Sequence, residues 1–586
     1  MGFLTPTEPP FDVDSWRAKP HLARIKPLAQ DWAINGFGTP TAVYLLYLVK
    51  LVVFSFGAAL AISATTPELG GLGEFGDWWA QPIVFQKLVV WTLLWEVVGL
   101  GCGSMPLTFR FSPMIGGILY WLRPGTIRMP PWPDRVPMTA GSRRTPLDVG
   151  LYAAVLGLAG YLFIAGDEGV PGLAGGRLDP VAIAVLLGAL GLLGLRDKVS
   201  FLGARIEVYG FLLLVFLFPL SNLIVASQIV FVCIWWGAAS SKLNRHFPYV
   251  VSVMISNTPW NRSRRAKARL YRDHPSDLRP SSQAALAAHA GTIMEFSLPL
   301  LLLLSSGGVI GTLAVIGMVI FHVHITSTFP LAVPLEWNLF MIFGLLFLFG
   351  ENGSVPLSTL NDPVLIVVLA VFGVAIPVLG NFRPDLISFL PSMRYYAGNW
   401  ATSQWLFLKG TEAEDRLDRE VQKVAPIVVE QLAALYDRET AELLLNKGLA
   451  FRAMHSHGRA LNGLLPHAVD DVEAYAVREG ELISGVLNGW NFGDGHFHNE
   501  QLLAAVQEQV GYAEGDVRVI TLESQPAHIQ RQRYRIFDAA SGLIEEGWVN
   551  VADMVARGPW LEESWDFPTE VTWRRGQRVD PEPVPA

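Results

Sequence analysis

Charged residues are scarce in this chain of 586 residues. Asp, Glu, Lys and Arg together account for 16% of the sequence, whereas hydrophobic residues account for 51%. An ordinary soluble domain carries roughly 25% charged residues. This deficit and the long apolar runs together exclude an ordinary soluble globular protein and indicate an integral membrane protein.

Cysteine is almost absent, since Cys102 and Cys233 are the only two, and both fall in or beside apolar runs. Two such thiols provide neither a disulfide framework nor a zinc site. The first forty residues also lack the apolar stretch and the small-residue cleavage site of a signal peptide. We therefore expect the first apolar run, which begins near Thr41, to be retained as a membrane anchor.

Complete motifs of soluble enzymes are missing as well. The sequence has no phosphate-binding glycine loop, no Ser-His-Asp pattern and no paired cysteines, and the glycines of Gly493–Glu500 lack the spacing of a dinucleotide fingerprint. Motifs alone therefore do not identify a reaction.

The apolar runs predict about ten transmembrane helices. A bilayer core of about 30 Å requires about 20 apolar residues in a helix. The run 206–241 is interrupted around Pro219, so it is either two spans or one kinked span. The run Phe111–Leu122 is too short to cross and suits an interfacial or re-entrant segment. The predicted spans are 41–63, 84–104, 147–166, 179–195, 206–221, 223–241, 287–304, 308–327, 334–350 and 362–380.

Loop charge predicts the orientation, because Lys and Arg near helix ends favour the cytoplasmic side. With ten spans, the basic loops 105–146, 196–205 and 242–286 fall on one side together with the basic N-terminus. The acidic loops 64–83 and 351–361 fall on the other side. The sequence therefore predicts a multi-pass protein of the plasma membrane with both termini in the cytoplasm.

The chain divides into five predicted parts. Aromatic residues between 389 and 407 suit the membrane interface, and apolar residues recur at helical spacing from 412 to 481. From Asp516 the pattern alternates, and a turn at 538–542 predicts a β-hairpin. The fold class is therefore an all-α membrane bundle with a C-terminal α+β soluble domain. The parts are a cytoplasmic N-terminal segment (1–40), a transmembrane domain (41–380), an interfacial amphipathic linker (381–411), a cytoplasmic α+β domain (412–575) and a disordered tail (576–586).

Ionisable residues inside apolar runs are candidate site residues, because a charge in the membrane is costly. His322 and His324 are two residues apart in a helix and face different directions, so they are not expected to chelate one metal. The alternative is that these groups pair with one another and hold the bundle together. The candidates are Glu96, Glu295, His322, His324 and Glu336, with His289 at the start of a span.

Lys242 lies in the segment Trp235–Asn244, in which a run of small residues precedes the lysine. A lysine acts as a general base when desolvation lowers its proton affinity, and the rim of a membrane cavity meets that condition. The alternative is a lysine at a cytoplasmic helix end, which follows the positive-inside rule and suits the helix dipole.

His496 and His498 are candidate metal ligands in the C-terminal domain. In an extended strand both rings would point to one face, as a metal requires, and Asp494, Glu500 or His455 could complete the site. Against this interpretation, Asn499 suits a helix N-cap. The basic residues around 143–144 and 262–272 are interpreted as topology and contact with anionic lipid rather than as a nucleic-acid site.

The transmembrane part resembles the vitamin K-dependent γ-carboxylase family and its bacterial relatives, the horizontally transferred transmembrane domain proteins. Three pieces carry the resemblance, namely Trp236–Leu243, Asp197–Phe201 and Tyr209–Gly210, within about residues 40–380. The resemblance implies that Lys242 acts as a base toward a quinone or another isoprenoid lipid. The family also uses a histidine between the last two pieces, whereas the interval 202–208 contains Arg205 and Glu207 but no histidine.

Across its full length the chain also resembles an uncharacterised actinobacterial family of multi-pass membrane proteins. The matching stretches are Tyr120–Thr126, Phe389–Tyr396 and Gly493–Glu500. This resemblance implies a membrane protein and brings no activity with it.

Two functional hypotheses follow from these residues. In the first, the protein is a membrane enzyme acting on a lipid or isoprenoid quinone, with Lys242 as the base and Glu96, Glu295, His322 and His324 around the cavity. In the second, it is a non-catalytic lipid-binding or assembly protein of the cell envelope whose cytoplasmic domain docks a protein partner.

Overall fold

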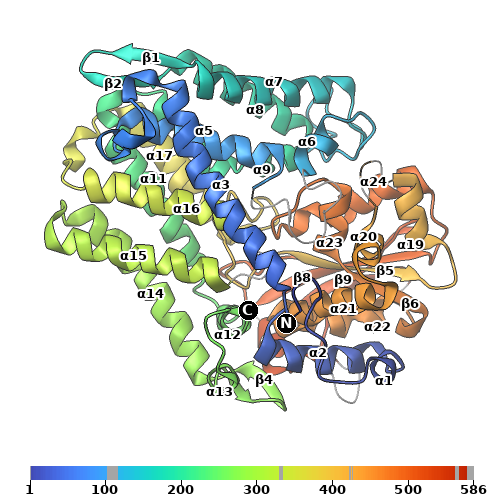
Figure 1. Ribbon diagram of the computed structural model, residues 1–586. Coiled ribbons are helices and arrows are strands. Elements are labelled where there is room, and N and C mark those ends of the chain that lie inside the picture. The colour runs from blue at the N-terminus through green and yellow to red at the C-terminus, as the bar shows by residue number, and fades with distance from the viewer. Residues whose placement is uncertain are drawn as a thin grey trace.

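The structure, a computed structural model, describes residues 2–101, 116–328, 334–421, 424, 426–560 and 567–576. A helical bundle forms one side of the molecule and a C-terminal domain built on a β-sheet forms the other (Figure 1). Cys102, the first residues of the run Phe111–Leu122 and all but the first residue of the predicted tail lie outside the described residues.

Six helices of the described residues are long and apolar enough to cross a membrane. Five of them expose most of their apolar side chains on the surface, as contact with lipid chains requires. The exception is α11, two thirds of which is buried inside the bundle. The six are α3 (Thr41–Thr65), α7 (Pro146–Ile164), α11 (Leu223–Ser241, with a 3-10 turn from Leu220), α14 (Ser282–Leu304), α15 (Gly308–Thr328) and the continuous helix α17–η9–α18 (Pro363–Phe382).

The count of about ten spans is therefore not supported. Helices α5 (Pro82–Val98) and α8 (Pro180–Arg196) have 17 residues each. At a rise of about 1.5 Å per residue they are about 26 Å long, less than the hydrocarbon core. The helix predicted at 334–350 consists of α16 (Leu335–Leu345) and the π-helical turn η7 (Leu346–Glu351).

The run 206–241 forms two helices rather than one kinked span. A first helix, η4 (Ile206–Gly210) with α10 (Phe211–Phe216), ends before Pro219, and α11 follows the 3-10 turn η5 (Leu220–Asn222). Pro219 cannot donate a helical hydrogen bond, which explains the break. The first helix has 11 residues and does not reach the length of a span.

Short elements connect these helices. The two β-hairpins are β1 (Asp167–Val170) with β2 (Leu173–Leu178), and β3 (Tyr271–Asp273) with β4 (Asp277–Pro280). The remaining pieces are η1 (Pro67–Leu69), η2 (Leu72–Glu74), α4 (Phe75–Trp78), α6 (Gly116–Trp121), α9 (Lys198–Gly203), α12 (Phe247–Asn257), α13 (Arg264–Ala268) and η8 (Leu357–Thr359).

The C-terminal domain contains a six-stranded antiparallel sheet in the order β10-β9-β8-β7-β5-β6. The predicted hairpin around residues 538–542 is confirmed, because it joins β8 to β9 with Asp538 opposite Gly542. The strands are β5 (Thr402–Leu408), β6 (Tyr475–Glu479), β7 (Val517–Leu522), β8 (Arg531–Asp538), β9 (Gly542–Asn550) and β10 (Glu570–Arg574).

Strand β5 differs from the sequence interpretation, which placed residues 402–408 in an interfacial linker. Residues 402–407 are all buried, because β6 and β7 flank the strand and helices pack against it. Aromatic residues serve a buried strand as well as a membrane interface, so composition did not distinguish the two. The helices of the domain are α19 (Ala413–Arg416) with η10 (Leu417–Val421), α20 (Val428–Leu435), α21 (Arg438–Met454), α22 (Ser456–Ala468), η11 (Val472–Ala474), α23 (Gly480–Leu487), η12 (Gly495–Phe497), α24 (Glu500–Val510) and α25 (Val551–Ala556).

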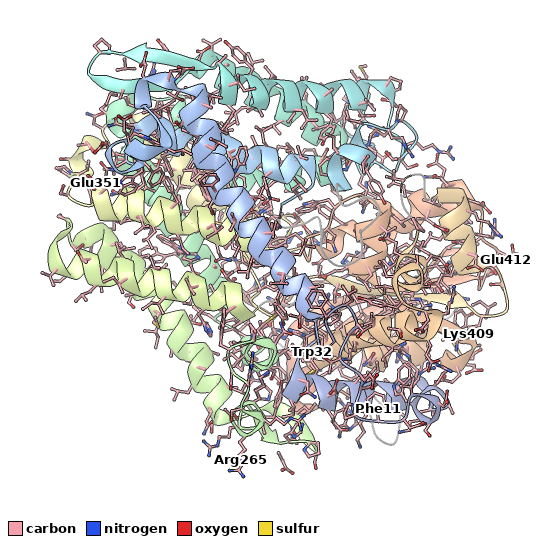
Figure 2. All side chains as sticks on the ribbon, viewed as in Figure 1. Phe11, Trp32, Arg265, Glu351, Lys409 and Glu412 are labelled. Carbon is pink, nitrogen blue, oxygen red and sulfur yellow. The ribbon has the colours of Figure 1, made fainter. Side chains whose placement is uncertain are left out.

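The N-terminal segment packs on the C-terminal domain. Its helices α1 (Val13–Arg17) and α2 (His21–Asn35) lie beside α21, where Trp32 contacts Phe451 with ring centroids 4.9 Å apart. Figure 2 shows Trp32 on the side of the C-terminal domain and Glu351 at the opposite end of the bundle. The N-terminal segment and the C-terminal domain therefore share one side of the bundle, and the cytoplasmic assignment of that side remains a prediction.

Candidate functional site

A cavity of about 190 Å³ lies where the bundle meets the C-terminal domain. Helices α11, α12, α14 and α15 form its bundle side, and Tyr395, Tyr396 and Phe492 close it from the C-terminal side. Ala287 and His324 line the cavity and are also exposed on the molecular surface, so the cavity reaches the surface between α14 and α15. Most of its wall is apolar, including Ile234, Ala238, Val250, Met254, Phe321 and Ile325.

Lys242 and Glu295 form a buried ion pair in this cavity. Lys242 follows the last residue of α11, and Glu295 lies in the middle of α14. Their side chains are only 10% and 4% exposed. The rings of Phe247 and Phe321 lie 5.5 and 5.9 Å from the lysine Nζ and shield it from solvent. Each charge depends on the other, because an isolated charge in such surroundings is very costly.

His322 is held by hydrogen bonds on both ring nitrogens. The Asn338 amide nitrogen donates to the Pro334 carbonyl, so its Oδ1 faces His322 Nδ1 at 2.8 Å and accepts a proton from it. The indole nitrogen of Trp235 donates to His322 Nε2 over 3.0 Å. The ring is therefore neutral with its proton on Nδ1, and it fixes the position of Trp235 in the cavity wall.

Arg205 supplies a second cation, at the end of the cavity next to the C-terminal domain. It has a left-handed backbone (φ 51°) and bonds Glu207 Oε1 over 2.7 Å. Tyr395 donates to the same carboxylate over 3.1 Å. The guanidinium carbon lies 5.4 Å from the ring of Trp337 and 4.8 Å from that of Phe492. This arrangement joins the bundle to the C-terminal domain through one charged cluster.

The cavity therefore combines an apolar wall with two cations that are each matched by a carboxylate. Binding sites for small molecules are typically apolar clefts in which a few polar groups fix orientation. A ligand with a polar head of hydroxyl or carbonyl groups and an apolar body fits this combination better than a free anion, because each cation already has a carboxylate partner, Lys242 in Glu295 and Arg205 in Glu207.

Four of the five predicted catalytic residues meet in this cavity. Lys242, Glu295 and His322 lie inside, and His324 lines its exposed edge. Glu96 does not line it. That residue is buried in α5, and its Oε2 lies against Gly101, where an added Cβ would come within 1.9 Å.

Two other lysines of the bundle have polar partners, and one of them forms an ion pair, as the structural alternative anticipates. Lys50 Nζ in α3 lies 2.8 Å from Glu336 Oε2 at the start of α16, and both side chains are almost fully buried. Lys87 in α5 donates to the hydroxyl of Thr66 over 2.7 Å and to the carbonyl of Thr65. Lys50 and Lys87 were not among the predicted site residues, although both lie in apolar runs.

The two predicted metal ligands lie in the C-terminal domain, and each has another partner. His496 Nε2 lies 2.9 Å from Glu523, and His498 Nδ1 lies 2.6 Å from the Ser403 hydroxyl. Residues 495–497 form a 3-10 turn rather than a strand, and Asn499 caps α24 as its residue type predicts. No group of three or more His, Cys, Asp or Glu suited to a metal occurs among the described residues.

Sequence reasoning did not assign Arg205, Trp337, Tyr395 and Phe492 to the cavity. Arg205 could have been predicted from the sequence, because it and Glu207 form a charged pair in the interval where the carboxylase family has a histidine. Tyr395 and Phe492 carried none, because they reach the cavity only through the packing of the C-terminal domain on the bundle.

The family described as "Transmembrane protein of unknown function (DUF3556)" matches residues 1–572. Neither a curated protein nor a solved structure matches the chain.

Proposed function

The chain belongs to the DUF3556 family of transmembrane proteins, and we propose that it binds an isoprenoid quinone or a similar amphipathic lipid in the cavity around Lys242. The observation that carries this proposal is the buried Lys242–Glu295 pair inside a mostly apolar cavity that opens between two helices long enough to span a membrane. Polar groups of the ligand would replace the solvent that this pair has lost, and its apolar chain would leave between α14 and α15.

A carboxylase-like reaction is one use of this site. The proton of Lys242 would pass to Glu295, and the resulting amine would take a proton from a hydroxyl of the reduced quinone. Proton sharing of this kind is favoured in apolar surroundings, where two neutral groups cost less than two charges. His322 would position Trp235 rather than accept a proton, because both of its nitrogens are already bonded.

A non-catalytic lipid-binding role uses the same cavity. The arginine cluster supports it, because Arg205 and Glu207 occupy the interval in which the carboxylase family has its histidine. In that role the ligand would tie the bundle to the C-terminal domain through Tyr395 and Phe492, and the domain would dock a protein partner.

Mass spectrometry of small molecules released from the detergent-purified chain tests the proposal. We expect a quinone or polyprenyl lipid at close to one copy per chain. The double variant Lys242→Met/Glu295→Gln leaves no unpaired charge. It should bind the lipid at least about tenfold more weakly, a change of about 1.4 kcal/mol in binding free energy. The matched control Lys50→Met/Glu336→Gln alters a buried pair that does not line the cavity and should retain the ligand. Bulk phospholipid alone, or equal retention in both variants, would reject the proposal.

A further inference from the structure

We propose that Ser456 is a nucleophile, activated by His246 and oriented by Gln525, for acyl transfer from a lipid ester. The residues come from three distant segments, namely the turn before α12, the first residue of α22 and the loop after β7. The catalytic group stands on its own geometry, and only the route of its substrate, through the cavity around Lys242, rests on the proposed function.

The three side chains form a hydrogen-bonded chain. Ser456 Oγ lies 2.6 Å from His246 Nδ1, and His246 Nε2 lies 2.8 Å from Gln525 Oε1. All three residues are buried, with exposures of 0%, 0% and 4%. A nucleophile within hydrogen-bond reach of a base, and a base oriented by a third group, is the arrangement that defines activated serine nucleophiles.

The direction of each hydrogen bond follows from the partners of Gln525. Its Nε2 donates to the Ile529 carbonyl over 2.8 Å, so its Oε1 faces His246 and accepts the proton on Nε2. The other ring nitrogen, Nδ1, is then a bare acceptor, and the Ser456 hydroxyl donates to it. Burial lowers the pKa of His246 to about 4, so the ring is neutral at pH 7 and its Nδ1 lone pair is available.

Asn399, which is 126 positions from Gln525 in the sequence, holds Gln525 in place. Its side chain accepts from the backbone nitrogen of Gln525 over 2.6 Å and donates to the Gln525 carbonyl over 2.8 Å. Gln525 is therefore fixed at both its backbone and its side chain, which leaves a single orientation for the His246 ring.

Ser456 also opens a helix whose N-terminus has no side-chain cap. The first amide groups of an α-helix have no partner within the helix, and such donors stabilise an oxyanion. Helix α22 has 13 residues, and Gly458 lets its first turn approach α21, since an added Cβ would lie 2.0 Å from the Arg452 carbonyl oxygen. Because Ser456 is the first residue of α22, its hydroxyl belongs to the same turn as these amides.

The loop of residues 396–400 lies between the cavity and the group formed by Ser456, His246 and Gln525. Tyr396 lines the cavity, and its ring lies 5.9 Å from that of Trp400, which in turn lies 4.6 Å from His457. An added Cβ on Gly398 would lie 2.9 Å from His246. Tyr396 and Gly398 both have a left-handed backbone, with φ of 45° and 77°. A displacement of this one loop would join the cavity to Ser456.

The proposed reaction needs only a lipid ester and water. Ser456 Oγ bonds the ester carbonyl carbon while its proton passes to His246 Nδ1. The bond to the alcohol oxygen then breaks, and the leaving alcohol takes that proton. Water attacks the acyl-serine, gives a proton to His246, and the acid leaves as this proton returns to Ser456 Oγ.

A second serine–histidine pair in the same domain provides a matched control. Ser403 Oγ lies 2.6 Å from His498 Nδ1, but its hydroxyl donates to the His498 carbonyl over 3.0 Å. The Ser403 oxygen therefore accepts a hydrogen bond from His498 Nδ1, whereas the Ser456 hydroxyl donates one to His246 Nδ1. Ser403 is buried to the same extent and should not react.

Covalent labelling of the full chain in detergent with a small alkyl fluorophosphonate, mapped by peptide mass spectrometry, tests the proposal. We expect the label on Ser456 and none on Ser403. His246→Gln should slow the labelling at least about 100-fold, since a positioned base contributes about 10²–10⁴. Ser403→Ala should leave it unchanged.

The variant Tyr396→Ala removes a large side chain between the cavity and Ser456. The fluorophosphonate should therefore label Ser456 faster in this variant than in the natural chain. Absence of label on Ser456 in both chains, or an equal rate in His246→Gln, would overturn the nucleophile. Retention of the cavity lipid in Ser456→Ala is measured separately. In the natural chain, absence of the label on Ser456 with the lipid bound would reject this inference alone, whereas the label on Ser456 without bound lipid would reject the proposed function and leave the nucleophile standing.

Discussion

Lys242 and Glu295 lie 53 positions apart in the chain and meet as a buried ion pair that joins the end of α11 to the middle of α14. Neither side chain has another partner of opposite charge within ion-pair distance among the described residues. Because each charge depends on the other, single and double substitutions of the pair should change the free energy of unfolding by different amounts.

Removing one member of the pair should cost far more than removing both. Lys242→Met or Glu295→Leu alone leaves an uncompensated buried charge and should destabilise the chain by about 3–5 kcal/mol, whereas the double variant should be close to neutral. Thermal unfolding in detergent measures all three. Additive losses in the double variant would show that the two residues act independently.

Filling the cavity should displace its ligand without disturbing this pair. Gly291 lines the cavity, and an added Cβ there meets no atom within 4 Å. We expect Gly291→Phe to fold normally and to lose at least about tenfold of the bound lipid, or about 1.4 kcal/mol of binding. Gly188 in α8 is equally unobstructed but lies outside the cavity, so Gly188→Phe is the control and should keep the lipid.

The pair of His496 and Glu523 should give the C-terminal domain a pH-dependent contribution to stability. Burial acts against protonation of His496, but Glu523 at 2.9 Å outweighs it and raises the pKa of the imidazole. Burial acts to raise the pKa of Glu523, and His496 outweighs it and lowers that pKa. The histidine contribution is therefore complete below about pH 6.5 and is lost as pH rises through the raised pKa, and the glutamate contribution is complete above about pH 4.3.

The stability difference between the natural chain and His496→Gln should accordingly be largest between about pH 4.3 and 6.5 and should shrink at higher pH. Unfolding midpoints over pH 5–9 measure it. His455→Gln gives the opposite trend, because burial and Arg452 lower the pKa of His455 to about 3. In the natural chain His455 stays neutral while folded and takes up a proton on unfolding. Acidification below about pH 6.5 should therefore lower the stability of the natural chain relative to that of His455→Gln. If the stability differences of the two variants changed with pH in the same direction, the opposite pKa shifts assigned to His496 and His455 would be contradicted.

Docking of the N-terminal segment should depend on Lys447. Its Nζ lies 3.3 Å from Asp31 and 3.2 Å from the Phe37 carbonyl, and the lysine and aspartate side chains are almost fully buried. Lys447→Met should release α2 and make the chain around residue 40 sensitive to limited proteolysis. The exposed pair of Arg17 and Glu439 joins the same two parts. Arg17→Ala should have no such effect, because exposed pairs contribute about 0–1 kcal/mol.

The membrane class and the β8–β9 hairpin could be predicted because both depend on local patterns. Long apolar runs give the first, and alternation around the turn at Asp538 gives the second. The span count could not be predicted in this way. Helix α5 is nearly as apolar as a span, but it ends at Gly99, which has a left-handed backbone, and most of it is buried inside the bundle.

The cavity was predictable where a charge stood out against apolar neighbours, as at Lys242 and Glu295. It was not predictable at Tyr395 or Phe492, which are ordinary aromatic residues until the C-terminal domain closes on the bundle. The chain from Ser456 to Gln525 through His246 spans 279 positions, and no spacing rule connects them. Such sites depend on tertiary contacts alone.

The contact between α2 and α21 has a consequence for biosynthesis. Lys447 is translated after all six candidate membrane helices, so α2 is made first and lacks its contact with α21 while those helices insert. The side of α2 that packs on α21, where Trp32 meets Phe451, stays uncovered until the ribosome has passed α21. A nascent chain arrested before that point should therefore recruit chaperones through its first 40 residues, and completion of the C-terminal domain should release them.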